Sequence, residues 1–91
     1  MKKMTFSEFL KDDYAVVRCH TREEFDFLMD KLIAMTPYGM YYNPNKGLEG
    51  VWYDYGTDSC VQNDGVGSSY QFYSQLDNYT IYDFKDVDFS K

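Results

Sequence analysis

The order of apolar and polar residues at the start of the chain predicts a short helix followed by a strand. The segment Thr5–Glu8 has the spacing of a capping box, with Thr5 as the N-cap of a helix that continues to about Lys11. Three residues of this helix face the core: Phe6, Phe9 and Leu10. The pair Asp12-Asp13 ends it. Residues 14–19 then form a β-branched strand, which places three side chains on one face: Ala15, Val17 and Cys19.

The most regular pattern predicts a longer helix from Thr21 to Thr36. Residues Thr21–Glu24 form a second capping box. The apolar residues that follow recur at helical spacing: Phe25, Leu28, Met29, Leu32 and Ile33. Pro37 ends the helix, because a residue before proline avoids the α region. We expect this stripe to lie in the core.

Turn-forming residues dominate the next segment and predict a loop over residues 38–50. Val51–Tyr55 and Thr57–Gln62 are then expected to form two strands around Gly56.

The last third of the chain predicts a turn, a short helix and a strand. Residues 63–69 form the turn, and Tyr70–Leu76 form the helix, with Ser68 or Ser69 as its cap and Asn78 as a left-handed stop. Tyr79–Phe84 form the strand. Val87 and Phe89 alternate with aspartates, which indicates that strand pairing continues.

This order of elements predicts an α+β fold with residues 1–91 as a single domain. We expect one small antiparallel or mixed sheet in a single layer. The main helix, about residues 21–36, packs on one face of it, and two short helices complete the domain. A chain of 91 residues has room for one core.

Charge and aromatic residues are distributed unevenly along the chain, whose net charge is −6. Residues 38–91 carry eight acids against three bases, and nine of the ten tyrosines. No lysine, arginine or histidine lies between Lys46 and Lys85. Such a surface repels nucleic acid and attracts basic protein surfaces, and exposed tyrosine adds contact area. We therefore expect a module that binds a basic protein and contacts neither nucleic acid nor membrane.

The acidic and aromatic residues of this tract are the expected partner-binding residues: Trp52, Tyr53, Asp54, Tyr55, Asp58, Asp64, Tyr70 and Tyr73. They would present carboxylates and rings where a basic groove expects phosphates. The competing interpretation is a solvated face that is acidic for solubility.

A second candidate site is the glycine-rich segment before the last helix, whose backbone amides are suited to a phosphate. Arg18 and Arg22 would supply counter-charges for a nucleotide held between subunits of a homo-oligomer. The ligand-binding residues would be Arg18, Arg22, Gly65, Gly67, Ser68 and Ser69. The segment lacks the lysine of a P-loop, and Asp64 beside it repels anions, so a plain turn and helix cap is the competing interpretation.

The cysteines and the histidine predict neither catalysis nor metal binding. Cys19 and His20 are neighbours on a strand, so their side chains point to opposite faces and cannot form a nucleophile–base pair. With Cys60 as the remaining cysteine, these residues are too few for a zinc site. We expect two free thiols, no cofactor and no enzymatic activity. The lack of a signal region or long apolar segment predicts a cytoplasmic protein.

Several segments, taken in order, resemble small accessory proteins of phages and prophages of Gram-positive bacteria. They are Thr5–Leu10, Tyr14–Val16, Cys19, Thr21–Phe25, Trp52-Tyr53, Cys60 and the closing segment Asn78–Phe84, where Asn78 replaces the usual glycine. The resemblance brings no active site with it. It implies a context in which short accessory genes often antagonise host defences.

In that context the leading hypothesis is an anti-CRISPR-like acidic decoy, which acts in the host cytoplasm and inhibits a nucleic-acid-binding defence protein. One alternative is a sponge that sequesters a nucleotide immune signal. Another is a structural or regulatory accessory protein of the phage.

Overall fold

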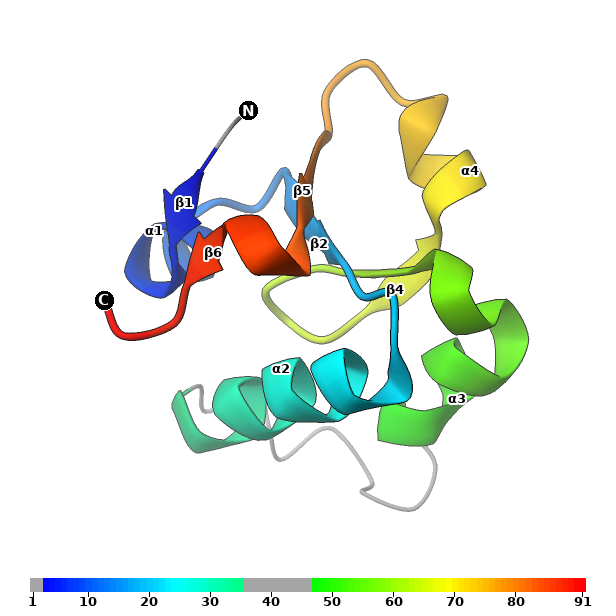
Figure 1. Ribbon diagram of the computed structural model, residues 1–91. Helices are drawn as coiled ribbons and strands as arrows, with labels where there is room; N and C mark the ends of the chain where they lie inside the picture. The colour runs from blue at the N-terminus through cyan, green and yellow to red at the C-terminus, as the bar shows by residue number, and fades with distance from the viewer. Residues whose placement is uncertain (1–2, 36–46) are drawn as a thin grey trace.

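The computed structural model describes residues 3–35 and 47–91, which form an α+β fold around a four-stranded mixed sheet (Figure 1). The strand order is β4-β3-β2-β5. Their bounds are Gly67–Ser69 for β4, Ser59–Val61 for β3, Ala15–Arg18 for β2 and Thr80–Asp83 for β5. β2 pairs antiparallel with β3 and parallel with β5, and β3 pairs antiparallel with β4. The predicted class, α+β with a small mixed sheet, is confirmed.

Helices pack on both faces of the sheet (Figure 1). The main helix α2 (Arg22–Met35) covers one face, and the short helix α4 (Tyr70–Ser74) covers the other. Alternate residues of β2 belong to the two sides, since Val17 lies in the core under α2 whereas Val16 packs with Cys60 and Tyr73 under α4. The predicted face of Ala15, Val17 and Cys19 is confirmed.

The first capping box forms as predicted at helix α1 (Phe6–Lys11). The Thr5 hydroxyl accepts from the Glu8 amide at 3.1 Å, and the Glu8 carboxylate accepts from the Thr5 amide at 2.9 Å. Phe6 and Phe9 are buried, and Asp12 caps the C-terminus.

The second capping box forms only in part. The Thr21 hydroxyl accepts from the Glu24 amide at 3.1 Å, but the Glu24 carboxylate accepts from the His20 amide instead of that of Thr21. The predicted end of α2 at Thr36-Pro37 and the turn residues 38–46 lie outside the described residues.

The apolar stripe of α2 is in the core except for one residue. Phe25, Leu28, Met29 and Leu32 are at most 3% exposed, whereas Ile33 is 36% exposed. At about 100° per residue, Ile33 lies about 90° from the centre of the other four, so it sits at the edge of the buried stripe. The prediction that Ile33 is a core residue is wrong.

Val51–Tyr55 is helical, so the predicted strand there is wrong. Helix α3 spans Gly47–Tyr55, which also replaces the end of the predicted loop. Its apolar residues recur at helical spacing: Leu48, Val51, Trp52 and Tyr55. Gly56 ends the helix with a φ of 54°, a left-handed conformation that glycine adopts without strain. After the turn η2 (Gly56–Asp58), the next predicted strand is confirmed only for Ser59–Val61.

The segment predicted as a turn over residues 63–69 is a tight hairpin whose second strand is β4. Gly67 in β4 lies so close to β3 that an added Cβ would be 2.5 Å from the Cys60 carbonyl oxygen. Ser69 caps α4 as expected, since its hydroxyl accepts from the Phe72 amide. Asn78 is not left-handed, because in the described part of the chain only glycines have a positive φ. Instead, right-handed turn hydrogen bonds from Gln75 and Leu76 follow the helix.

The C-terminal segment pairs with the N-terminal one rather than with the main sheet. After β5 and the turn η3 (Phe84–Asp86), strand β6 (Val87–Asp88) pairs parallel with β1 (Met4–Thr5). The expected continuation of pairing therefore occurs, but in a second, two-stranded sheet.

Candidate functional site

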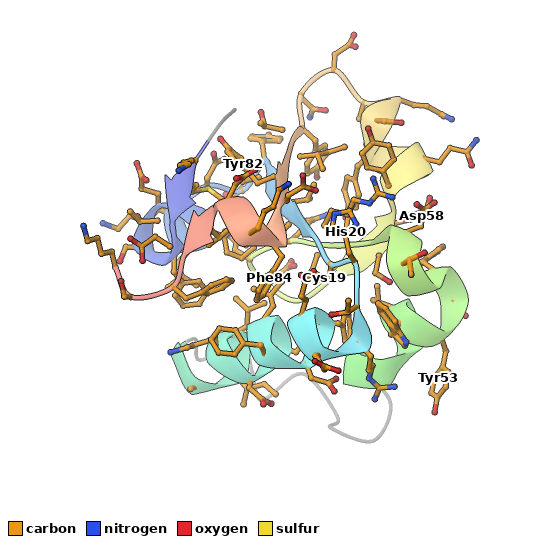
Figure 2. The ribbon with its side chains drawn as sticks, in the orientation of Figure 1. Cys19, His20, Tyr53, Asp58, Tyr82 and Phe84 are labelled. Atoms are coloured by element: carbon orange, nitrogen blue, oxygen red, sulfur yellow. The ribbon has the colours of Figure 1, made fainter. Side chains whose placement is uncertain are left out.

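Five of the predicted partner-binding residues lie on three neighbouring elements, α3, η2 and α4, which Figure 1 shows on one side of the molecule. They are Tyr53, Asp54, Tyr55, Asp58 and Tyr70, and we call them the acidic-aromatic surface. Tyr53 is 72% exposed and points away from α3 (Figure 2). Tyr55 and Tyr70 are also exposed. Tyrosine rings exposed to solvent beside carboxylates are typical of a surface that contacts another protein.

A base from outside the acidic tract enters this surface. Arg18 at the end of β2 forms an ion pair with Asp58, at 3.2 Å between Nη2 and Oδ1, and its guanidinium lies 4.3 Å from the centre of the Tyr70 ring. The Nε of Arg18 is buried without a hydrogen-bond partner among the described residues. Asp58 is therefore partly neutralised, and Asp54 is the carboxylate of this surface without an ion-pair partner in the described part of the chain.

A second base is brought to the same end of the sheet. His20 Nε2 lies 2.8 Å from Asp83 Oδ1, and Asp83 is paired with Arg18 in the register of β2 and β5. Arg18 and His20 are far from Asp58 and Asp83 in sequence, so the charge pattern along the chain did not reveal these pairs. The charge of Arg18 makes this face less negative than the base-free interval alone suggests.

Three other predicted residues do not belong to the exposed surface. Trp52 is half-buried and packs on Phe25, with ring centres 5.8 Å apart. Tyr73 is 2% exposed, its hydroxyl accepts from Gln62 at 2.7 Å, and burial raises its pKa. Asp64 accepts from the Val66 amide within the hairpin loop. Trp52 and Tyr73 therefore contribute to the packing of the core, and Asp64 stabilises the hairpin turn.

The residues of the nucleotide alternative are not arranged as a phosphate loop. Gly67, Ser68 and Ser69 form strand β4, and α4 is a helix of five residues in which the hydroxyl of the N-cap Ser69 already accepts from the Phe72 amide. Arg22 pairs with Asp26 at 3.0 Å on α2. Arg18 faces two carboxylates, which oppose an anion at the same place.

Register does bring Arg18 and Ser68 onto one face, because both flank Cys60 in adjacent strands. Gly65, by contrast, lies in the hairpin loop beyond the strands. The ligand candidates are therefore split between the sheet, the loop and helix α2.

The two thiols are free and buried on opposite faces of the sheet. Burial raises the pKa of Cys19 far above its ordinary value, and it raises the pKa of Cys60 to about 12, although the nearby Arg18 opposes this rise. His20, labelled in Figure 2, is exposed, and its Nε2 pairs with Asp83. A buried thiol with a raised pKa is a poor nucleophile, and the His20 ring is engaged by Asp83.

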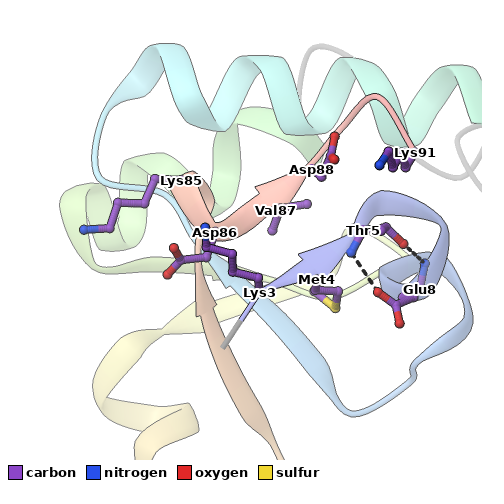
Figure 3. Close-up of a pocket in the computed structure, with 9 residues that line it drawn as sticks. All are labelled: Lys3, Met4, Thr5, Glu8, Lys85, Asp86, Val87, Asp88 and Lys91. Carbon is purple, nitrogen blue, oxygen red and sulfur yellow. Dashed lines mark hydrogen bonds between the residues drawn. The ribbon is translucent and has the colours of Figure 1, made fainter. Parts of the chain in front are cut away.

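A shallow cavity of about 350 Å³ lies over the β1–β6 pair (Figure 3). It is lined by three lysines and three acids: Lys3, Lys85, Lys91, Glu8, Asp86 and Asp88. The Glu8 carboxylate is engaged in the capping box, and that of Asp88 accepts from Ser90, which lowers the pKa of Asp88. The balanced charges of this cavity select neither an anion nor a cation.

Comparison with protein-family models, with curated proteins and with solved structures finds no match to this chain. Among residues 3–35 and 47–91, no three side chains of histidine, cysteine, aspartate or glutamate converge as metal ligands would. Within the same residues, no helix combines the length and apolarity needed to cross a membrane.

Proposed function

We propose that this protein is a non-enzymatic binding module, whose acidic-aromatic surface contacts a basic partner protein. The observation that carries the proposal is the exposure of Tyr53, at 72%, beside Asp54 and Tyr55 at the end of α3. A tyrosine ring has few rotatable bonds, so it supplies contact area at a low cost in entropy.

The chemistry of this surface matches lysine- and arginine-rich partners. A guanidinium binds a carboxylate through charge-assisted hydrogen bonds and also stacks on aromatic rings. The contact of Arg18 with Asp58 and with the Tyr70 ring is an internal example of both interactions. Asp54 and Tyr53 offer the same two groups to solvent.

The sequence resemblance bears on the class of the partner protein. The resemblance to phage accessory proteins supports a bacterial defence protein, whose basic nucleic-acid groove would be occupied by the acidic surface. This narrower proposal rests on that resemblance alone, whereas the binding role rests on the exposed residues of α3.

The proposal is tested with a defined basic probe, a fluorescently labelled nona-arginine peptide, by fluorescence anisotropy. Asp54→Lys should weaken binding about tenfold, because the reversed charge repels the basic probe. Asp77→Lys is the matched control, since Asp77 is also an exposed acid of the base-free interval and its reversal changes the net charge equally. Equal losses in both variants would show that only net charge matters, and the proposed surface would be wrong.

Tyr53→Ser separates aromatic from charge contributions, because it leaves the net charge unchanged. It should weaken binding of the probe several-fold at about 150 mM salt, where screening has already reduced the purely electrostatic contribution to the affinity. Capture from a bacterial lysate by wild type and by Asp54→Lys, followed by mass spectrometry, would then identify the partner and test the narrower proposal.

A further inference from the structure

We propose that a groove formed by Phe27, Phe84 and Phe89 is a second docking surface, which takes an apolar side chain of a partner protein flanked by lysine or arginine. The groove has a volume of about 530 Å³, and it is completed by Thr21, Glu23 and Glu24 at the start of α2. It does not depend on the acidic-aromatic surface, which is formed by other elements (Figure 1).

The floor of the groove consists of three phenylalanine rings in mutual contact. Phe27 meets Phe84 and Phe89 edge to face, with ring centres 5.8 and 5.1 Å apart, and Phe84 lies 4.9 Å from Phe89. They come from α2, η3 and the segment after β6, and Figure 2 shows Phe84 on the side of η3 that faces α2. Such a floor accepts an aliphatic or aromatic side chain.

The groove is held in shape by the C-terminal segment. Phe89 packs on Phe6 of α1, with ring centres 5.5 Å apart. Beyond it, the amide and hydroxyl of Ser90 both donate to Asp88, and the Ser7 amide donates to the Lys91 carbonyl at 2.9 Å. A groove that is formed before binding loses little entropy when a ligand enters it.

Internal packing does not use the whole of this cluster. Phe27 remains 44% exposed although it contacts both other rings. The Lys31 ammonium lies 5.6 Å from the centre of the Phe27 ring, so a cation of this chain already contacts part of the ring. Phe27 therefore presents apolar surface that suits an apolar side chain of a partner.

The charge of the rim indicates which occupant fits. Glu23 is exposed, and Glu24 uses one carboxylate oxygen to accept from the His20 amide. Two carboxylates beside an apolar floor attract a lysine or arginine next to the apolar anchor. A second copy of this chain is a poor occupant, because each copy has a net charge of −6 and like charges repel.

The test uses a capped synthetic hexapeptide with a central Phe-Leu pair between two lysines on each side. A control peptide has Ser-Ser at its centre. Isothermal titration at low salt should show that wild type binds the Phe-Leu peptide at least about fivefold more tightly, because truncating a buried apolar anchor costs about that factor. Equal affinity for the two peptides, or no binding of either, would overturn the proposal.

Variants locate the binding to the groove. Phe27→Ser and Glu23→Lys should each lower the affinity for the Phe-Leu peptide at least about fivefold. Ile33→Ser is the matched control, an exposed apolar residue of the same helix that does not line the groove, and should bind as wild type does. Glu23→Lys alters an exposed side chain, so it remains informative if Phe27→Ser does not fold. Unchanged peptide affinity in Glu23→Lys would refute the groove as the binding site. The proposal would also be wrong if light scattering showed that the wild type is a dimer and that Glu23→Lys or Phe27→Ser dissociates it.

Discussion

Replacing Leu32 by alanine probes the packing of α2 on the sheet. Leu32 is 3% exposed and belongs to the larger core cluster. The change removes three carbon atoms, about 2.4 kcal/mol of transfer free energy at about 0.8 kcal/mol for each buried methylene. The cavity that remains adds to this, so the free energy of unfolding should fall by about 3 kcal/mol, within the range of about 2–5 kcal/mol for such changes. For a domain of this size that is a large share of the total stability.

The neighbouring residue supplies the control. Ile33 is 36% exposed, so Ile33→Ala loses less buried surface, and the better helix propensity of alanine returns about 0.4 kcal/mol. We expect a loss of about 1 kcal/mol or less. Urea melts followed by the fluorescence of Trp52, the single tryptophan, report the transition because its ring packs on Phe25. The described orientation of α2 would be wrong if Leu32→Ala cost less than about 1 kcal/mol, or if both variants cost the same.

The remaining predictions concern the thiols and a close backbone contact. Cys19 and Cys60 should resist a thiol reagent in the native protein and both react after denaturation without reductant, whereas a mass two hydrogens lighter with no labelling would contradict free thiols. The pKa of both thiols is raised in the folded state, so the folded chain keeps protons that the unfolded chain loses above about pH 8.5. The free energy of unfolding should therefore fall as the pH rises beyond that value. The fall should be less steep in the double variant Cys19→Ala/Cys60→Ala. Gly67→Ala should lower the free energy of unfolding by about 1–3 kcal/mol in urea melts, because its Cβ would lie 2.5 Å from the Cys60 carbonyl oxygen. Gly56→Ala has open space around it but a positive φ, so it should lower that free energy by about 1–2 kcal/mol or less. A silent Gly67→Ala would show that β3 and β4 are not in such close contact.

Local patterns in the chain were sufficient to predict the elements that depend on nearby residues. The capping box at Thr5 forms because both of its hydrogen bonds join residues three apart. The buried stripe of α2 and the alternating faces of β2 follow from the periods of helix and strand, so sequence spacing alone places these side chains. The cap at Ser69 belongs to the same group.

The elements that were mispredicted depend on packing between distant segments. Val51–Tyr55 is rich in residues that favour strands, yet it forms a helix, because Val51 and Trp52 pack against the core and α3 lies against β3 and β4. Gly67–Ser69 has a turn-like composition, yet it pairs with β3, which glycine permits by allowing a close approach. Local propensity is a weak preference that tertiary contacts override.

The surfaces divide in the same way. The sequence alone establishes that the second half of the chain is acidic and rich in tyrosine, because composition does not depend on the fold. Only the tertiary structure buries Tyr73, pairs Arg18 with Asp58 and His20 with Asp83, and brings Phe27, Phe84 and Phe89 together. The two ion pairs join residues 40 and 63 positions apart, and Phe27 is likewise distant in sequence from Phe84 and Phe89. A pattern along the chain carries no signal for such pairs, since the register of β2 with β3 and β5 and the return of the C-terminal segment to α1 and β1 create them.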